Sequence, residues 1–385
     1  MSKKVIMACS NYWTSPLQVG SHQIAKVFVK KGWEVAFLTD PISAFHPLKG
    51  LSQDLKDRYD LYRAGGRRFC DGRLWAYVPG ALVTPANQPG FRGHWLHQNW
   101  HRLTLPGAVE KVRANGFYGA DLLYIDSIYQ PHWLTTLNCR QTFLRVPDNH
   151  SGFSKFTAAA CAAEKKIAQQ VDLVGYTAPS LKDYVAGFGP KRTALIPNGV
   201  NFQHFAGTAR PMPADLAAIP KPIAVYVGAI EAWFDFDLLR ILSQRMPEVS
   251  FVLIGPEKLA AERLKGLPNV HLLGRRKYDD LPAYLQHSDV GIIPFDVKGH
   301  ATLINYVNPL KLYEYLACGL PCVSVRWRAL EELHSPAILC DTAEEFERGL
   351  RAALAPPVAR ASNVEYARAF DWESQVDKLL AALAN

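Results

Sequence analysis

Two charged residues, Lys311 and Glu314, stand three positions apart at the start of a predicted helix. Asn308 could cap that helix with Pro309 in its first turn, and Gly319 could end it. The first turn of a helix attracts an anion through its free N–H groups and its dipole. Lys311 would add a positive charge for a phosphate, and Glu314 would lie on the same side to accept the hydroxyls of a sugar. The spacing allows a nucleotide diphosphate site, although an exposed lysine–glutamate pair is the commoner explanation of spacing alone.

Acidic and basic side chains also follow two predicted strands in the first half of the chain. Asp126 follows residues 121–125, and Asp148 and His150 follow residues 141–146. Open α/β sheets bind ligands at the carboxyl ends of their parallel strands, where these side chains would lie. A carboxylate or an imidazole at that edge could take the proton of a hydroxyl nucleophile. Asp148 is the first candidate for this base, with Asp126 and His150 in reserve, and the alternative is that Asp148 caps the next helix.

Loops after other predicted strands could complete these sites. In the first half, Gln18 and His22 lie where a ligand could meet the start of a helix at 21–31. In the second half, one loop follows the strand at 223–227 and another follows the strand at 270–273. The residues of these two loops that we expect to contact a nucleotide are Gly228, Ile230, Arg275 and Tyr278.

The elements that would position these residues form two α/β domains. A chain of 385 residues is long for one core and comfortable for two. Strands at 5–8 and 34–38 enclose the helix at 21–31, which is a βαβ unit with a parallel pair. Because the first loop lacks the G-x-G-x-x-G pattern, a dinucleotide-dependent dehydrogenase is disfavoured. Residues 208–222, rich in Pro and Ala, are expected to link the domains, and residues 41–109 are expected to be irregular apart from a strand at 74–78.

The composition is that of an ordinary globular protein, with 49% hydrophobic and 20% charged residues. A net charge of +8 suggests an anionic partner, but the basic residues are spread out and no nucleic-acid-binding module is visible. Seven cysteines without a regular spacing argue against a disulfide framework and a zinc site, and favour the reducing cytosol. Neither a signal peptide nor a transmembrane segment is predicted, so we expect a cytoplasmic protein.

The string N-P-L-K-L-Y-E-Y-L-A-C-G-L-P at residues 308–321 resembles the donor-site helix of the GT-B glycosyltransferases. In that family a Glu before a small-x-Gly-x-Pro turn grips the ribose of the nucleotide, which implies this role for Glu314. Many retaining members carry a second Glu eight residues earlier, where this chain has Tyr306. The closer resemblance is to the xanthan glucuronosyltransferase type, an inverting branch with a Lys three residues before the ribose-binding position. Lys311 fits that role.

A second motif resembles the same branch. The xanthan enzyme type has an R-x-x-D-x-x-S pattern at a strand-to-loop position, and Arg145, Asp148 and Ser151 repeat it here. The resemblance implies that Asp148 is the catalytic base of an inverting transfer. Asp235 and Asp237 also spell the D-x-D of metal-dependent GT-A enzymes, but Asp235 is well placed to cap the helix that follows it. We therefore expect neither a metal nor a cofactor.

The resemblance implies a GT-B fold, in which two Rossmann-like, doubly wound parallel-sheet domains face each other across a cleft. Residues 1–205 would bind the acceptor, with a helix at 372–385 crossing back to them, and residues 206–371 would bind the donor. The implied reaction moves a sugar, which could be glucuronic acid, from a UDP-sugar. Its acceptor would be a hydroxyl of a lipid-linked or saccharide molecule in bacterial-type polysaccharide assembly.

Each implied site has its own set of residues. The residues assigned to acceptor binding are Gln18, His22, Asp126 and His150. The residues assigned to donor binding are Gly228, Ile230, Arg275, Tyr278, Asn308, Lys311 and Glu314. Two alternatives stay open, namely a catalytically silent GT-B subunit that binds a nucleotide sugar or a partner transferase, and a non-hydrolysing nucleotide-sugar epimerase. Tyr306 stands where many retaining members carry a Glu, and this replacement is the reason that a catalytically silent subunit remains an alternative.

The stretch 91–103 could bring the first domain to a membrane surface. It places Trp95 and Trp100 among Arg92, Arg102 and three histidines. Indoles favour the bilayer interface, and basic side chains are attracted to anionic lipid. We expect peripheral contact at the inner face of the plasma membrane, unless these tryptophans pack in the core.

Overall fold

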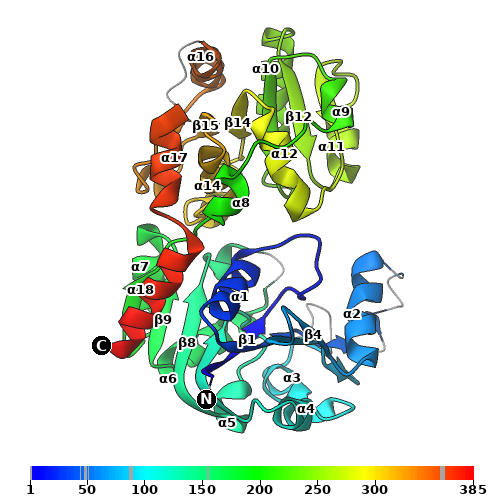
Figure 1. Cartoon of the computed structure of the whole chain (residues 1–385), viewed down its shortest axis with the longest axis vertical. Helices are drawn as coiled ribbons and strands as arrows, with labels where there is room; N and C mark the ends of the chain where they lie inside the picture. The colour runs from blue at the N-terminus through cyan, green and yellow to red at the C-terminus, as the bar shows by residue number, and fades with distance from the viewer. Residues whose placement is uncertain are drawn as a thin grey trace. The chain divides into compact units, whose positions relative to one another are not determined.

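The computed structural model describes residues 2–43, 45–46, 50, 52–85, 90–153, 156–355 and 360–385. The chain divides into two compact units (Figure 1). Unit 1 comprises Met1–Ile196 together with Val376–Asn385, and unit 2 comprises Pro197–Gln375. The boundary therefore precedes the expected one after residue 205. Residues 208–222, expected to be a linker, lie inside unit 2.

The sheet of unit 1 has eight strands in the order β10-β9-β8-β7-β1-β2-β5-β4. β4 pairs with β5 in antiparallel, and the other neighbours pair in parallel. The central strands are continuous apolar runs because helices cover both faces of such a sheet. The strands are β1 Lys4–Cys9, β2 Glu34–Thr39, β4 Arg67–Phe69, β5 Leu74–Tyr77, β7 Gly119–Ile125, β8 Asn138–Val146, β9 Leu173–Tyr176 and β10 Thr193–Leu195, with a separate pair β3 Ile42–Ser43 and β6 Gly80–Ala81.

The helices of unit 1 include several that the sequence patterns did not predict. They are α1 Gly20–Lys30, α2 Gln53–Arg63, α3 His94–Asn99, α4 Ala108–Ala114, α5 Trp133–Thr136, α6 Ala158–Gln170 and α7 Lys182–Ala186, with 3₁₀ turns at Trp100–Leu103, His150–Gly152 and Pro179–Leu181. The expectation that the rest of residues 41–109 is irregular is wrong, since α2, α3, β3, β4 and β6 lie there, whereas β5 confirms the expected strand at 74–78. Ser52 caps α2, which buries only Leu55 and Leu61 and so has a weak apolar stripe.

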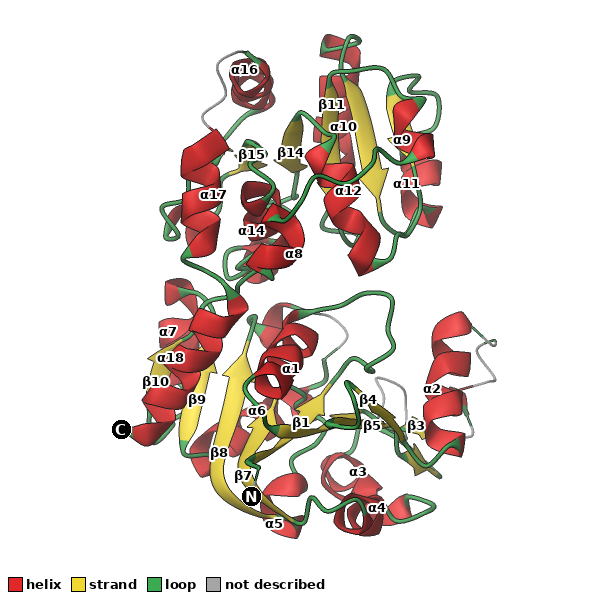
Figure 2. Ribbon diagram, viewed as in Figure 1, coloured by secondary structure: helices red, strands yellow, loops and turns green. Residues whose placement is uncertain are grey.

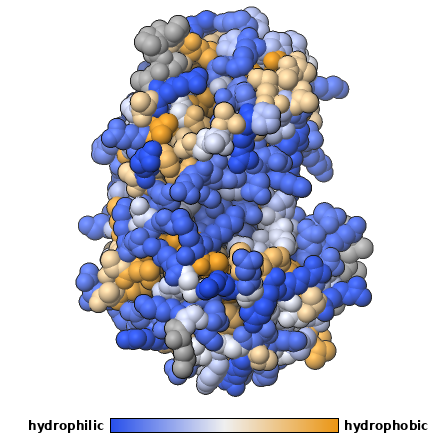
Figure 3. All heavy atoms as spheres, in the orientation of Figure 1, coloured by the Kyte–Doolittle hydropathy of each residue, from blue (hydrophilic) through white to orange (hydrophobic). Residues whose placement is uncertain are grey.

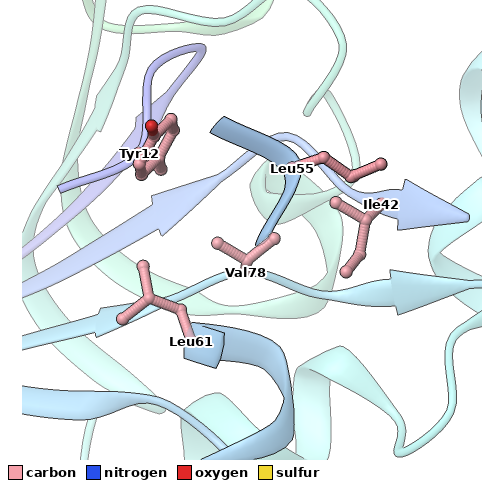
Figure 4. Packing of buried hydrophobic residues seen from close by; sticks show 5 residues of the cluster. All are labelled: Tyr12, Ile42, Leu55, Leu61 and Val78. Atoms are coloured by element: carbon pink, nitrogen blue, oxygen red, sulfur yellow. The ribbon is translucent and has the colours of Figure 1, made fainter. Parts of the chain in front are cut away.

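A small hydrophobic cluster fixes α2 in place. Leu55 and Leu61 of α2 pack with Tyr12, Ile42 and Val78, all less than 10% exposed (Figure 4). Tyr12 comes from the loop after β1, Ile42 from β3, and Val78 follows β5. The cluster therefore holds α2 against segments at the carboxyl ends of β1, β2 and β5.

The sheet of unit 2 has six strands, all paired in parallel, in the order β13-β12-β11-β14-β15-β16. They are β11 Ile223–Val227, β12 Ser250–Ile254, β13 Val270–Leu272, β14 Val290–Ile293, β15 Cys322–Val325 and β16 Ile338–Cys340. Helices alternate with these strands along the chain (Figure 2). The prediction of two Rossmann-like α/β domains is confirmed.

The helices of unit 2 are mostly short. They are α8 Phe202–Ala206, α9 Ala214–Ala217, α10 Phe236–Arg245, α11 Lys258–Arg263, α12 Leu281–Gln286, α13 Ala301–Ile304, α14 Leu310–Ala317, α15 Arg328–Glu331, α16 Ala343–Leu354 and α17 Arg360–Arg368, with a 3₁₀ turn at Tyr278–Asp280. The final helix, α18 Trp372–Ala384, starts in unit 2, and its residues from Val376 onward belong to unit 1. There Lys31 pairs with Asp377 at 2.7 Å, and Gln141 donates to the carbonyl of Leu383 at 2.8 Å.

The visible surface is mainly hydrophilic, with hydrophobic residues in scattered patches (Figure 3). Within the described residues, every helix is too short or too polar to span a bilayer. The seven cysteines are all free thiols.

Candidate functional site

The amino end of α14 differs from the predicted one by one residue. The helix begins at Leu310, so Pro309 takes the cap position, and the prediction that Asn308 caps the helix is wrong. Asn308 is 3% exposed, and its side-chain oxygen accepts a hydrogen bond from the Tyr313 hydroxyl at 2.8 Å. Its carbonyl accepts a second one from Asn198 at 2.7 Å. Asn308 therefore fixes the start of α14 from within the fold.

The carboxyl end of α14 is the one predicted. Gly319 has φ +72°, a left-handed conformation that glycine adopts without strain. Its N–H donates to the carbonyl of Leu316 at 2.9 Å, and that of Leu320 donates to the carbonyl of Tyr315 at 3.0 Å. This pair of bonds is a Schellman motif, which stops the helix before β15. Both ends of α14 are therefore fixed.

Lys311 lies in an aromatic cage beside the end of β11. Its Nζ stands 5.0 Å from the ring centre of Tyr226 and 4.8 Å from that of Phe295. Gly228, the first residue after β11, has φ +145°, and a side-chain carbon there would lie 3.1 Å from Cε of Lys311. A glycine is therefore required at position 228 for the lysine to cross this strand end.

Lys311 and Glu314 are both half-buried, and neither makes an ion pair or a side-chain hydrogen bond in the described part of the chain. The alternative of an exposed surface ion pair is therefore wrong. Burial lowers the pKa of Lys311 to about 8, against the opposing effect of Glu314. Burial raises the pKa of Glu314 to about 7, against the opposing effect of Lys311. Two desolvated charges at one helix start, neither in an ion pair or a side-chain hydrogen bond among the described residues, indicate a ligand site.

Three glycines form a close backbone contact around this site. A side-chain carbon at Gly255, after β12, would lie 2.1 Å from the carbonyl oxygen of Gly228. The N–H of Gly255 donates to the carbonyl of Gly274, which follows β13 and has φ +69°. The ends of three neighbouring strands thus pack backbone against backbone, which side chains at these positions would prevent. Sequence reasoning found Gly228 but missed Gly255, because only the strand pairing brings them together.

The other expected donor residues differ in accessibility. Tyr278 is 7% exposed and stacks on His204 with ring centres 4.9 Å apart. Burial raises the pKa of the Tyr278 hydroxyl, and the nearby charge of Glu314 raises it further. Arg275 is exposed, whereas Arg276 is committed to Asp215.

Ile230 is 2% exposed and packs under Gly255, so it shapes the loop after β11 without facing solvent. The interpretation of Asp235 as a helix cap is confirmed, since its carboxylate accepts the N–H of Leu238 at 2.8 Å. The described residues contain no group of three His, Cys, Asp or Glu side chains arranged for a metal.

In unit 1, Asp148 follows β8 and is half-buried. The alternative that it caps the next helix is wrong. Asn149 caps the 3₁₀ turn by accepting the N–H of Ser151 at 3.1 Å, and Thr157 caps α6. Burial lowers the pKa of the Arg145 guanidinium, but the charges around it, Asp148 among them, outweigh burial and raise it. A carboxylate with no capping role at the end of a parallel strand remains the candidate base.

Asp126, expected to bind the acceptor, is already engaged through both carboxylate oxygens. One oxygen pairs with Arg145 at 3.4 Å, and the other accepts a short hydrogen bond from Ser21. Its side chain is only 7% exposed. The geometry makes Asp126 the anchor of Arg145 and not a free base.

The two residues expected near the start of α1 have structural partners. His22 is 0% exposed, with one ring nitrogen 2.9 Å from the carbonyl of Tyr12 and the other accepting the N–H of Val19. It therefore holds the loop after β1 and does not face an acceptor, contrary to expectation. Gln18 is half-buried, and its amide oxygen accepts a hydrogen bond from Lys26 at 2.6 Å.

Asp40 is a site residue that sequence reasoning missed. It follows β2 at the same sheet edge, and one of its oxygens accepts hydrogen bonds from Ser127 at 2.6 Å and Gln130 at 2.9 Å. Arg58 of α2 donates to its carbonyl at 2.8 Å. Burial raises the pKa of Asp40 to about 6 against these bonds. Its second oxygen makes no hydrogen bond in the described part of the chain. In the sequence, the only feature that pointed to Asp40 was its position directly after a strand.

Two sequence families match the two units. Residues 7–177 match the family described as "Glucuronosyltransferase GumK, N-terminal domain", and residues 221–355 match "Glycosyl transferases group 1". The chain is a GT-B glycosyltransferase of the GumK type. This agrees with the resemblance of its donor helix.

Solved structures share the fold of this GumK-type chain at low identity. Sucrose-phosphate synthase from Thermosynechococcus elongatus is 17% identical, with a TM-score of 0.70 over 98% of each chain. The Anabaena protein HepE in complex with UDP and glucose is 15% identical, with a TM-score of 0.67 over 99% of each chain. A Bacillus subtilis protein named for teichuronic acid biosynthesis, TuaH, is 24% identical over 185 residues. That alignment spans 46% of each chain, less than half of the relative's length.

Proposed function

We propose that this GumK-type chain transfers a sugar from a UDP-sugar to an acceptor hydroxyl in polysaccharide assembly. The observation that carries the proposal is the pair Lys311 and Glu314 at the start of α14, half-buried and without an ion pair or a side-chain hydrogen bond among the described residues. An ammonium and a helix start suit a diphosphate, and a carboxylate suits the ribose diol. The Anabaena protein solved with UDP and glucose has the same fold, which supports UDP as the nucleotide.

The sugar in this proposal is a uronic acid. Two comparisons support it, since one family is named for a glucuronosyltransferase and one relative for teichuronic acid biosynthesis. Arg275, exposed beside the candidate donor site, could pair with the sugar carboxylate. Glucose is the alternative that the bound Anabaena structure suggests.

The proposed mechanism is a direct, inverting displacement. Asp148 takes the proton of the acceptor hydroxyl as its oxygen bonds to the anomeric carbon. The bond to UDP breaks, and its electron pair stays on the diphosphate, where Lys311 and the start of α14 stabilise the charge. No metal ion or cofactor is needed in this scheme, and turnover should survive EDTA.

The test is a panel of UDP-sugars on the full chain. UDP-glucuronic acid should raise the melting temperature more than UDP-glucose or UDP-N-acetylglucosamine, because a bound ligand stabilises the folded state by mass action. Release of UDP should then depend on an acceptor. Binding without UDP release would favour a silent subunit, and conversion of the donor without an acceptor would favour an epimerase.

Glu314→Gln should weaken UDP and reduce the preference for ribose over deoxyribose. The carboxylate accepts both ribose hydroxyls, and a charged acceptor makes a stronger hydrogen bond than an amide. Calorimetry with UDP and 2′-deoxy-UDP measures the ratio in parent and variant. Glu257→Gln, an exposed residue of the same unit, is the control. An unchanged ratio would remove Glu314 from the ribose site.

We further propose that unit 1 contacts anionic membrane, where a lipid-linked acceptor would reside. Trp95 is 64% exposed and Leu105 is 71% exposed, with Arg92 and Arg102 exposed on the same segment. Trp100 does not take part. It is 0% exposed in a cluster with Leu96 and Ala81, so its expected membrane role is wrong.

Vesicle sedimentation checks this contact. The parent should pellet with phosphatidylserine vesicles at low salt and less at high salt, because basic residues near the surface gain about 1 kcal/mol each. Trp95→Ser with Arg92→Gln and Arg102→Gln should stay in the supernatant while folded. Leu195→Ser, another exposed apolar residue of unit 1, is the control. A parent that never pellets would favour a soluble saccharide acceptor.

A further inference from the structure

A buried acid of unit 1 has no part in the mechanism above. Glu164 of α6 is 0% exposed, although an isolated carboxylate is costly to bury. One of its oxygens accepts a hydrogen bond from Nδ1 of His150 at 2.8 Å. The other accepts one from the Tyr184 hydroxyl at 2.8 Å. Both oxygens are thus satisfied, and the carboxylate sits at a fixed distance from the imidazole.

His150 stands two residues after Asp148, in the 3₁₀ turn that follows β8. Its ring packs against Phe156 with centres 4.6 Å apart and is otherwise held by Glu164. Nδ1 is committed to the carboxylate, so in a residue that is 7% exposed Nε2 is the ring nitrogen left for a proton. An imidazole held at one nitrogen by a buried carboxylate is the arrangement of a general base with its orienting group.

We propose that Glu164 is a positioning residue that holds His150 as a second proton acceptor beside Asp148. The inference rests on the proposed transfer to a hydroxyl. When Asp148 does not take it, the proton of the acceptor hydroxyl, or of water during donor hydrolysis, passes to Nε2. At the same time the oxygen bonds to the anomeric carbon, and the bond to UDP breaks with its electron pair on the diphosphate. Glu164 stabilises the imidazolium that forms.

The charges around His150 agree with this role. The titratable or charged groups that face it or its neighbours are Glu164 from α6, Tyr184 from α7, Asp148 from the same loop, Asp126 from the end of β7 and Arg145 from β8. Burial lowers the pKa of His150, but the hydrogen bond and charge of Glu164 outweigh burial and raise it above 6.5. A base whose pKa lies near the working pH is the efficient kind.

A purely structural role for Glu164 predicts something different. A buried hydrogen-bonded pair of this kind would stabilise the fold, and its loss would lower the melting temperature and shift the His150 titration without moving the pH profile of the rate. Glu164→Gln is therefore the decisive variant, since it keeps the size and one hydrogen-bond acceptor and removes the charge. Asp121→Asn, which weakens the carboxylate contact to the backbone of Lys4, is the matched control for a lost acid in unit 1.

The first measurement is the titration of the His150 ring by NMR in the full chain, assigned by its loss in His150→Gln. Its pKa should lie above 6.5 in the parent and fall by on the order of one unit in Glu164→Gln. Asp121→Asn should leave it unchanged. This readout needs no activity, so it tests the pair even if no donor is turned over. Identical titration in the parent and in Glu164→Gln would overturn the proposal.

The second measurement is hydrolysis of UDP-glucuronic acid and UDP-glucose across pH. In an Asp148→Asn background, adding His150→Gln should remove most of the remaining rate, roughly tenfold or more. Adding Glu164→Gln should move the acid limb of that rate to lower pH. If the rate and profile do not change with His150→Gln, the inference is wrong and the proposed function stands. If the parent binds UDP but hydrolyses and transfers nothing, the proposed function fails first.

Discussion

Asp148→Asn should lower the turnover of the UDP-sugar by roughly 10²–10⁴-fold, which is the usual contribution of a positioned base. The amide has the same shape as the carboxylate but cannot take the proton of the acceptor. Asn149 and Thr157 carry the caps of the following turn and helix, so the variant should remain folded. Steady-state UDP release with the acceptor gives the rate, and a melting curve shows that the fold survives.

The controls for this variant follow from the division into two units. Asp148 belongs to unit 1 and the candidate donor residues belong to unit 2, so UDP binding should be unchanged. Asp183→Asn removes an exposed acid of α7 and should have no effect on turnover. A near-parent rate for Asp148→Asn would leave His150 as the base, because Asp126 is committed to Arg145 and Ser21.

Lys311→Met should weaken UDP and UDP-sugars alike by about 1.5–3 kcal/mol, the range for hydrogen bonds that involve a charge. Methionine keeps an unbranched apolar chain between Tyr226 and Phe295, and only the charge is lost. The loss should be equal for every sugar, because the ammonium contacts the phosphate. Calorimetry with UDP and two UDP-sugars measures it, with the exposed Lys265→Met as the control.

The pH dependence of UDP affinity gives an independent check. The pKa of Lys311 is about 8, so its positive charge is lost, and affinity should fall, as the pH rises past about 8. The pKa of Glu314 is about 7, so its stronger acceptor form is lost as the pH falls below about 7. Binding should therefore be tightest between the two, and Lys311→Met should abolish the alkaline fall. A parent whose affinity is flat from pH 6 to 9 would contradict both assignments.

The fold could be predicted from the sequence where elements bury continuous apolar runs. The central strands of both sheets are of this kind, and their order along the chain implies parallel pairing. The stretch 41–109 could not be predicted, because α2 has only two buried residues among eleven and its position depends on contacts with Tyr12 and Val78. The edge strand β4 is three residues long and mostly exposed, which leaves no apolar pattern.

In the site, too, the roles set by neighbouring residues could be predicted, whereas the roles set by residues far away in sequence could not. Gly319 was predicted correctly because a helix end is decided by its own residues. Asn308 was assigned the wrong role because Tyr313 competes for its side chain, and the cage of Tyr226 around Lys311 comes from a strand far away in sequence. Asp40 was missed because a single acid after a strand has no motif, and only its bonds to Ser127 and Gln130 distinguish it.

The fixed ends of α14 bear on how the donor preference of such a chain could be redesigned. Tyr313 is held by Asn308, and Tyr315 accepts the N–H of Val227 at 2.9 Å, so the helix has no freedom to adapt to a new ligand. The groups proposed for α14 recognise only the diphosphate and the ribose, which every UDP-sugar shares. A library that varies Arg275 while leaving α14 untouched would therefore search among sugars without losing the common affinity for the nucleotide.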